Sequence, residues 1–270
     1  MKNKLFLKIS LVIVLGLVIL NSYLPTVYSA RQVLKIGATA IHAEILRVIK
    51  GDLAKEGIEL EIIEFTDYIT PNLALADGSI DANYFQHIPY LEQFKKDHGL
   101  DLTYTVKVNI YPIGLYSKKL ESIEELADGA TIALPNDPTN EGRAFLILEQ
   151  NGLIKIDQEV KKSLLITPLD IVDNPKKLKF RELEAALLPR ALDDVTAAFI
   201  NTNYALEAGL NPAEDPILRE GKESPYANVV AVRTEDQNNP LIIKLGQYLT
   251  SEKVKTYILD KYNGAIVPVF

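Results

Sequence analysis

The sequence contains no cysteine and, apart from Met1, no methionine. The missing thiols exclude disulfide bonds, thiolate metal sites and cysteine-based catalysis. They also leave no cysteine that could carry a lipid. Only three histidines are present, His42, His87 and His98, and they show no metal-ligand spacing such as His-x-x-x-His. We therefore expect neither a bound metal nor a cofactor.

The N-terminal segment has the features of an export signal rather than of a folded element. Three lysines provide a positive start, and a largely apolar run follows over residues 9–20. This run is shorter than the ~20 residues that a helix needs to span a bilayer. We therefore expect residues 1–29 to be a signal peptide that is cleaved after Ser29 or Ala30. An uncleaved N-terminal anchor is the alternative.

Charge and length narrow the class of protein further. Removal of the signal segment would take away three lysines and no acid, so the formal charge would change from −7 to −10. An acidic balance of this kind argues against nucleic acid and against anionic lipid as partners. About 240 residues would remain, more than the ~100–150 typical of one domain, which favours two lobes.

Strand and helix patterns alternate along the rest of the chain. Short apolar or alternating runs predict strands, and apolar residues at every third or fourth position predict helices. The predicted strands lie at residues 33–37, 58–62, 80–85, 103–116, 131–134, 164–167, 195–200 and 228–233. The predicted helices lie at residues 42–56, 71–77, 89–98, 140–151, 184–188, 204–208, 240–249 and 252–262. This alternation indicates α/β layers around mostly parallel sheets.

Two long apolar runs, at residues 103–116 and 228–233, are the places where we expect the chain to pass between lobes. One lobe would then hold residues 30–111 plus 232–270, and the other would hold residues 112–231. A cleft between two α/β lobes is a common place for a small ligand.

Residues 136–143, with the sequence Asn-Asp-Pro-Thr-Asn-Glu-Gly-Arg, join a predicted buried strand to a predicted helix. A helix N-terminus directs N–H groups and the positive end of the helix dipole at an anion. Arg143 adds a planar group that can bind a carboxylate through two hydrogen bonds. The alternative is a solvated arginine on a helix capped by Thr139 or Asn140. Taken alone, the segment favours this alternative.

Other polar and aromatic clusters change that balance. They fall at predicted strand ends and turns and comprise residues 65–68, 83–90, 201–204 and 226–228. Strand ends are where α/β proteins place ligand contacts, although asparagines there are often only turn formers. The sequence has no Ser/His/Asp arrangement around a Gly-x-Ser-x-Gly turn and no glycine-rich phosphate loop. Amides and rings without a nucleophile or base predict a binding pocket rather than a catalytic site.

Several longer motifs share one resemblance. They are GAT at residues 37–39, FTDY at 65–68 with PN at 71–72, DANYFQH at 81–87, PNDPTNEGR at 135–143 and SPYAN at 224–228. Together they resemble the NlpA/MetQ family, the methionine-binding subunits of ABC importers. The resemblance extends over residues 33–270. It implies an α/β fold of the two-lobe, type II-like periplasmic-binding-protein class, with the ligand in the cleft between the lobes.

The resemblance also implies a ligand-binding set. Arg143 would bind the ligand carboxylate, and Asn203 and Asn228 would be amide partners of the amino-acid head group. The wall of the side-chain pocket would consist of Tyr68, Phe85, His87 and Tyr90. Asn140 completes the expected set. Aromatic edges suit a polarizable thioether, and a zwitterionic head group needs fixed polar partners when it leaves water.

The expected function is that of a receptor that captures L-methionine and delivers it to the membrane subunits of an ABC importer. A different ligand, either D-methionine or a methionine-containing dipeptide, is one alternative. An enzyme of the same two-lobe shape is another. Members of the family usually carry a lipidated cysteine after the signal segment, and this chain has none. We therefore expect a monomeric, freely soluble protein of the periplasm, with no nucleic-acid partner.

Overall fold

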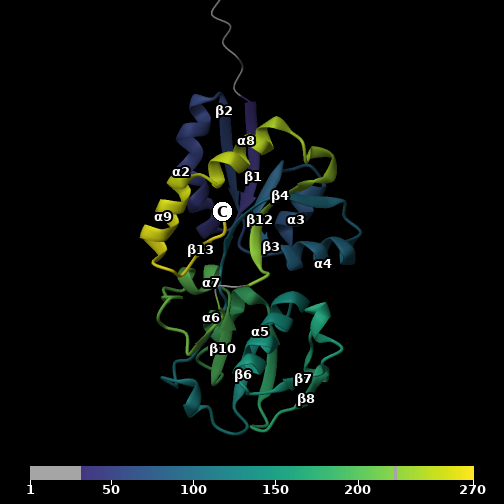
Figure 1. Cartoon of the computed structure of the whole chain (residues 1–270), viewed down its shortest axis with the longest axis vertical. Helices are drawn as coiled ribbons and strands as arrows, with labels where there is room; N and C mark the ends of the chain where they lie inside the picture. Colours follow the sequence, from purple (N-terminus) through teal and green to yellow (C-terminus); the bar gives the residue numbers. More distant parts are fainter. Residues whose placement is uncertain (1–31, 222–223) are drawn as a thin grey trace, which may run out of the picture. The chain divides into compact units, whose positions relative to one another are not determined.

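The computed structural model describes residues 32–221 and 224–270. The expected signal segment, residues 1–29, lies outside this part. Val33–Phe270 form one compact unit, and its strands form two larger sheets and a two-stranded hairpin (Figure 1). Within the described ranges, no helix combines the length and the apolar character needed to cross a bilayer.

The six-stranded sheet, called the large sheet below, contains both parallel and antiparallel neighbours. Its strand order is β13 (Val267–Pro268), β4 (Leu102–Ile110), β12 (Ala227–Arg233), β3 (Ala82–His87), β1 (Gln32–Ala38) and β2 (Ile58–Glu64). Strands β1 and β3 run parallel, whereas β12 is antiparallel to both β3 and β4. The C-terminal segment therefore inserts a strand into the centre of a sheet that the N-terminal segment begins.

Helices cover both faces of the large sheet (Figure 1). On one face lie α2 (Ala40–Lys55), α8 (Pro240–Leu249) and α9 (Glu252–Tyr262), and on the other lie α3 (Thr70–Ala76) and α4 (Ile88–His98). Strand β12 contributes to both cores, because successive side chains of a strand point to opposite faces. Val230 and Val232 pack on the first face, and Val229 and Ala231 on the second.

The five-stranded sheet, called the small sheet below, has the same layered construction. Its order is β11 (Leu218–Arg219), β5 (Gly114–Tyr116), β10 (Ala197–Ile200), β6 (Thr131–Pro135) and β9 (Lys179–Leu183). Strand β6 is parallel to β10 and β9. Helix α5 (Pro138–Gln150) packs on one face, and α6 (Leu188–Ala191) and α7 (Thr202–Glu207) pack on the other.

Short elements complete this half of the chain. The hairpin consists of β7 (Lys155–Ile156) and β8 (Ile171–Asp173). Single turns of 3₁₀ helix lie at Ile123–Glu125, Lys161–Ser163, Pro168–Asp170, Ala185–Leu187 and Thr234–Asp236.

The two helices that border the cavity described below begin at well-defined caps. Asp137 caps α5, since its Oδ1 accepts a hydrogen bond from the backbone N–H of Asn140 at 3.0 Å. His87 caps α4, since its Nδ1 accepts from the backbone N–H of Tyr90 at 3.0 Å. Both helices carry proline in the first turn, where its missing N–H costs nothing. Helix α4 ends at Gly99, whose φ of 64° is the left-handed conformation that glycine adopts readily.

The chain passes between the sheets at two places. The first is residues 111–113, where Pro112 separates β4 from β5, within the long apolar run that predicted such a passage. The second lies between β11 and β12. The predicted boundary between residues 231 and 232 is wrong, because it falls inside β12, all seven residues of which pair with β4. The other lobe boundaries stay predictions.

One predicted strand, residues 164–167, is absent from the structure. Leu164 has a φ of 60°, and the segment continues as a bend that places the buried Ile166 against α5. The edge strand of the small sheet, next to β6, is β9. Three of the five residues of β9 are charged, as is common for a strand at the edge of a sheet, so its sequence shows no alternation of apolar and polar residues.

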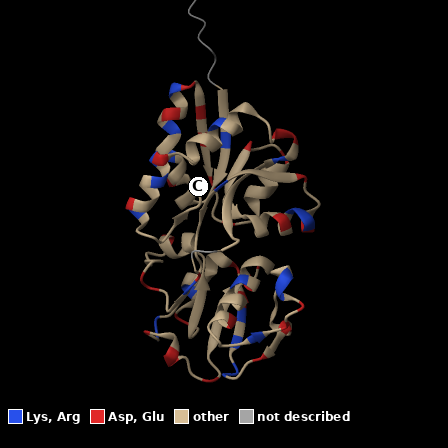
Figure 2. Ribbon diagram, in the orientation of Figure 1, with Lys and Arg blue, Asp and Glu red and all other residues tan. Residues whose placement is uncertain are grey.

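Charged residues of both signs are spread over helices, strands and loops (Figure 2). Several of their ion pairs are exposed, as between Lys118 and Asp193, and pairs of this kind contribute little to stability. One pair of the described residues differs, since Arg143 and Glu220 have side chains that are only 2% and 9% exposed. This buried pair lies beside the cavity described next.

Candidate ligand-binding site

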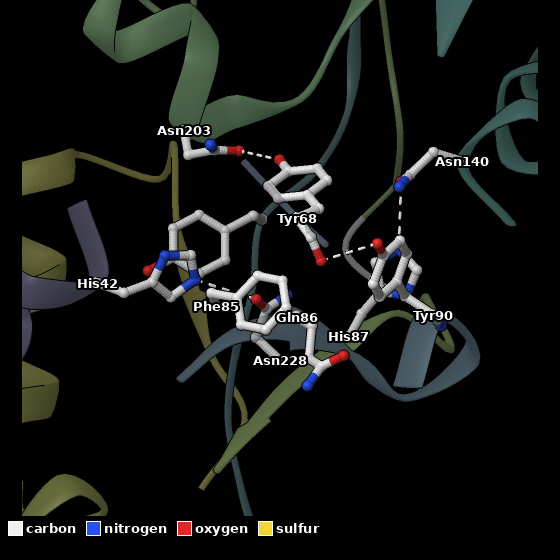
Figure 3. A pocket seen from close by; sticks show the side chains of 10 residues that line it. His42, Tyr68, Phe85, Gln86, His87, Tyr90, Asn140, Asn203 and Asn228 are labelled. Atoms are coloured by element: carbon white, nitrogen blue, oxygen red, sulfur yellow. Dashed lines mark hydrogen bonds between the residues drawn. The ribbon is translucent and has the colours of Figure 1, made fainter. Parts of the chain in front are cut away.

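A cavity lies where the ends of β3 and β12 approach the first residues of α5 and α7. It is lined by His42, Tyr68, Phe85, Gln86, His87, Tyr90, Tyr111, Asn140, Asn203 and Asn228 (Figure 3). The empty space among these side chains, including the part that is open to solvent, is about 320 Å³. Both sheets contribute residues to it, so a ligand held there would contact both.

Seven of the eight residues predicted from the sequence line this cavity, and the eighth, Arg143, lies next to it. Fold topology brings them together: Phe85 and His87 come from the end of β3, Asn228 from the neighbouring β12, and Asn203 from α7. The backbones of His87 and Asn228 are directly opposite each other in the sheet. Clusters that are far apart in the sequence thus meet at one place.

Aromatic rings form one wall of the cavity. The ring centroid of Tyr68 lies 5.9 Å from that of Phe85 and 5.9 Å from that of Tyr90. The Tyr90 hydroxyl donates to the backbone carbonyl of Tyr68 at 2.9 Å, which fixes the Tyr90 ring against the segment that carries Tyr68. Burial raises the pKa values of both tyrosines well above the usual range. The wall is therefore uncharged at neutral pH.

His87 links the two sheets across the cavity. Its Nδ1 caps α4, and its Nε2 lies 3.1 Å from Oδ1 of Asn140. An amide oxygen only accepts, so Nε2 carries the proton and Nδ1 does not. Burial lowers the pKa of His87 to about 3, with a further contribution from Arg143. His87 is thus a neutral side chain that holds α5 against α4.

Asn140 is saturated by protein partners. Its Oδ1 accepts from His87 and from Nδ2 of Asn201 at 3.0 Å, and its own Nδ2 donates to both oxygens of Asp137. These contacts use both ends of the amide. The geometry indicates that Asn140 positions its neighbours.

Arg143 is held by the protein rather than presented to the cavity. Its Nε donates to Oε1 of Glu220 at 2.8 Å, and its Nη2 donates to the other carboxylate oxygen and to the backbone carbonyl of Tyr111. The guanidinium carbon lies 4.4 Å from the ring centroid of Tyr226. Only Nη1 is directed toward the cavity side, where it lies 3.5 Å from Oδ1 of Asn140.

This arrangement corrects part of the sequence interpretation. A two-pronged contact from Arg143 to a ligand was expected, and in the structure Glu220 occupies that edge of the guanidinium. The helix also begins earlier than predicted, so Arg143 lies in its second turn and the cap is Asp137 rather than Thr139 or Asn140. Glu220 had no role in the sequence interpretation, because nothing in the local sequence marks it as buried.

The two remaining asparagines have one feature in common. Oδ1 of Asn203 accepts from the Tyr68 hydroxyl at 2.5 Å, and Oδ1 of Asn228 lies 3.0 Å from Nε2 of His42. Nδ2 of Asn203 is buried and has no hydrogen-bond partner among the described residues. Buried N–H groups without a partner are rare in folded proteins, so this amide is a candidate donor to a ligand.

The sequence interpretation missed three lining residues, His42, Gln86 and Tyr111. Gln86 is fully engaged, since its amide pairs with Asn72 and Asn83. His42 showed no ligand spacing in the sequence, and in the structure both of its ring nitrogens have partners while its side chain borders the cavity. Its place just after the motif at residues 37–39 was the one available signal.

Comparison with known proteins agrees with this architecture. The D-methionine-binding lipoprotein MetQ of Escherichia coli (strain K12) is 46% identical over 234 residues, which are 86% of this chain and 85% of that protein. A nutrient-binding protein from Burkholderia cenocepacia, solved with methionine bound, is 46% identical, with a TM-score of 0.85 over 88% of this chain and all of that chain.

A further similar structure is described as a periplasmic substrate-binding protein. The ABC transporter periplasmic substrate-binding protein from Coxiella burnetii is 45% identical, with a TM-score of 0.83 over 87% of this chain and all of that chain. The fold is therefore the α/β fold of periplasmic substrate-binding proteins, and these relatives are described as binding proteins, not as enzymes. The sequence model described as NlpA lipoprotein matches residues 34–270, and this chain belongs to that family.

Proposed function

We propose that this protein is a solute-binding receptor that captures L-methionine and delivers it to an ABC importer. The observation that carries the proposal is a small cavity in which aromatic rings face amide donors. The relatives described as binding methionine support the same ligand class.

The aromatic wall would hold the thioether of the ligand. Sulfur near a ring edge is worth about 0.3–1.5 kcal/mol, and Tyr68, Phe85 and Tyr90 offer several such edges. L-Norleucine, which has a methylene in place of the sulfur, should therefore bind up to about tenfold more weakly than L-methionine.

The polar end of the cavity would hold the head group. The available donors are Nδ2 of Asn203, Nδ2 of Asn228 and Nη1 of Arg143. A ligand carboxylate is the group that such donors suit, because it accepts several hydrogen bonds at once. His87 and Asn140 would support this end by fixing α5.

The stereochemistry of the ligand is the finer part of the proposal. We propose L-methionine, whereas several relatives are named for D-methionine. A dipeptide such as Gly-Met would have to fit the same cavity.

Calorimetry on refolded protein tests the proposal. The protein is unfolded and refolded to remove any ligand carried through purification, and it is then titrated with L-methionine, D-methionine, Gly-Met and L-norleucine. We expect L-methionine to bind most tightly and to raise the melting temperature. Absence of binding by every compound, or chemical conversion of a bound compound, would overturn the receptor assignment.

The cellular context is part of the same proposal. We infer a monomer in the periplasm that meets the membrane subunits of an importer and does not bind nucleic acid. The acidic balance of 29 basic and 36 acidic residues supports the last point. The relatives are named lipoproteins, whereas this sequence has no cysteine to carry a lipid. Fractionation of the native cells, followed by N-terminal sequencing, distinguishes a released protein that begins near Ala30 from one that keeps residues 9–20 in the membrane.

A further inference from the structure

His42 is a buried histidine that the proposed binding role does not yet use. It lies in the first turn of α2, is 2% exposed, and its ring packs between those of Tyr84 and Tyr111 at centroid distances of 4.7 and 4.4 Å. Both of its nitrogens have partners. Nδ1 lies 2.7 Å from the hydroxyl of Thr39, and Nε2 lies 3.0 Å from Oδ1 of Asn228.

The chemistry of these contacts fixes the positions of the protons. Oδ1 of Asn228 can only accept, so Nε2 of His42 must donate. Burial lowers the pKa of His42 to about 3, so the ring is neutral at physiological pH and Nδ1 has no proton. Nδ1 then accepts from the hydroxyl of Thr39.

Thr39 is available for this contact because its hydroxyl does not cap α2. The residue occupies the N-cap position, yet its side chain makes no capping hydrogen bond. N-cap threonines commonly bond to the helix backbone. In this protein the hydroxyl serves the histidine instead, so the three side chains form a chain of donors that runs from Thr39 to Asn228.

We propose that His42 is a positioning residue that fixes the orientation of the Asn228 amide. It holds the oxygen of this amide, so that the NH₂ group is left to bind the carboxylate of an amino-acid ligand. This inference rests on the proposed function. It adds which end of the amide meets the ligand and which residue decides it. Without His42 the amide could turn over, because its two ends have the same shape and opposite hydrogen-bonding character.

Asn203 is a second asparagine of the cavity whose amide oxygen is held by a donor of the protein. The hydroxyl of Tyr68 donates to Oδ1 of Asn203, and Nδ2 of Asn203 is left without a partner among the described residues. Two asparagines thus have their oxygens engaged by buried donors of the protein. A carboxylate would therefore find two NH₂ donors, whereas an ammonium group would find only the second lone pair of two oxygens that the protein already holds.

The first measurement needs no ligand. Nitrogen-15 NMR of the refolded protein distinguishes the two neutral tautomers of a histidine. We expect the Nε2-protonated form of His42 between pH 5 and pH 8. The Nδ1-protonated form, or an imidazolium in this range, would overturn the positioning role, whether or not the protein binds methionine. The correct tautomer in a protein that binds no methionine would instead count against the proposed function.

The second measurement uses an isosteric substitution to test which end of the Asn228 amide meets the ligand. Asn228→Asp keeps the oxygen that His42 holds and replaces the NH₂ group with a second oxygen. If the NH₂ group binds the ligand carboxylate, L-methionine affinity in calorimetry should fall by more than about a hundredfold. Retained or tighter binding would overturn the inference, because it would mean that this end meets the ammonium group. Asn238→Asp, at an exposed position, adds the same charge and should change affinity less than about twofold.

The third measurement separates positioning from packing. His42→Leu removes the donor to Asn228, and His42→Gln supplies a replacement N–H donor. We expect an affinity loss of about tenfold for the leucine variant and recovery to within about threefold for glutamine. Equal losses in both variants would show that only the ring volume matters and would overturn the role. His98→Leu, on the exposed end of α4, is the matched control.

If His42→Leu does not fold, Thr39→Val replaces it. This change removes only the hydroxyl that donates to Nδ1, and α2 loses no cap. A threefold or larger loss of affinity, together with a changed tautomer ratio of His42, is expected. An unchanged tautomer ratio would overturn the chain of donors.

Discussion

Arg143 and Glu220 form a buried ion pair, and this pairing determines what the removal of either side chain would do. Each is at least nine-tenths buried. A buried carboxylate that loses its partner cannot recover its hydration, so the cost falls on folding as well as on binding. The same pairing keeps the guanidinium fixed beside the cavity before a ligand arrives.

We expect Arg143→Ala to abolish methionine binding and to lower the free energy of unfolding by about 3–5 kcal/mol. The double variant Arg143→Ala with Glu220→Gln should recover most of the stability, because the unpaired charge is gone, but none of the binding. Urea unfolding and calorimetry measure the two effects.

The control for this pair is Lys118→Ala at the exposed ion pair with Asp193. It should cost less than about 1 kcal/mol. If the double variant recovers binding, Arg143 has no contact with the ligand, and the donors at the cavity are the asparagines alone.

Glu141 is a second buried acid, and it gives stability a pH dependence. It follows Asn140 in α5, and its Oε1 has no hydrogen-bond partner among the described residues. Burial raises the pKa of Glu141 to about 7, and the nearby carboxylates of Glu182, Asp137 and Asp170 add to the effect. A raised pKa means that the folded protein holds this proton more tightly than the unfolded chain does.

The sign of the pH dependence follows. The stabilising contribution is complete below pH ~4.5 and is lost as pH rises through about 7. Glu141→Gln, which mimics the protonated form, should match the wild type near pH 4.5 and exceed it by roughly 2 kcal/mol at pH 8. Unfolding in urea at several pH values checks this. A difference that does not vary with pH would show that Glu141 titrates normally in the folded protein.

At the scale of the element, helix α5 is held in place by the neighbouring segment 164–166 as well as by its N-terminal cap. A Cβ at Gly142 would collide with the backbone carbonyl of Leu164 and would lie 2.9 Å from the backbone nitrogen of Ile166. Glycine therefore allows α5 to approach the 164–166 segment closely. This close packing determines the position of the first turn of α5 relative to the cavity.

Gly142→Ala should therefore act on both stability and binding. Overpacking against backbone atoms costs about 1–3 kcal/mol, and displacement of α5 would stretch the contact between His87 and Asn140. We expect a lower melting temperature and weaker methionine binding. Gly51→Ala, in a helix position where a Cβ meets nothing within 4 Å, is the control and should be neutral or stabilising.

The sequence predicted most of these elements, because their patterns are local. Helices α2, α4, α8 and α9 have apolar stripes and clear ends, and their observed bounds lie within two residues of those predicted. Strand β9 was missed, because an edge strand with Lys179, Arg181 and Glu182 shows no hydrophobic alternation. Residues 164–167 were mistaken for a strand, because a buried bend and a buried strand have similar composition.

The site was predictable to the level of residue identity but not of hydrogen-bond direction. Seven predicted residues line the cavity because strand ends of the large sheet and the first turns of helices that follow strands of the small sheet meet there. The engagement of Arg143 by Glu220 depends on a contact between residues 77 positions apart. The orientation of the Asn228 amide depends on His42, 186 positions away. Contacts of that range leave no trace in local sequence pattern.

At the scale of the molecule, several hydrogen bonds join the two sheets around the cavity. The Tyr68 hydroxyl donates to Asn203, and His87 donates to Asn140. The Thr202 hydroxyl holds the connecting segment between the sheets, since it donates to the carbonyl of Pro112 at 2.5 Å. These contacts describe a closed arrangement. A ligand that touches both sheets would stabilise this state only by its higher affinity for it.

We expect the ligand-free protein to open by a hinge motion at residues 111–113, where the chain passes between the sheets. The sequence predicted a second passage between lobes at residues 228–233, but these residues belong to β12, a central strand of the large sheet, so we expect no hinge there. Small-angle scattering of refolded protein should give a smaller radius of gyration with saturating L-methionine than without it. Arg143→Ala protein, which we expect not to bind, should show no change. An identical radius for wild-type protein in both conditions would contradict the hinge.

The aromatic wall of the cavity also makes the ligand spectroscopically distinct. Ring currents from Tyr68, Phe85 and Tyr90 should move the resonance of a methyl group enclosed among them far from its position in water. Apart from Met1 the chain contains no methionine, so a ¹³C-labelled methionine methyl would be observed without a competing signal from the described residues. The protein could therefore report its own occupancy, in dilute solution or in a crude extract, through a single peak.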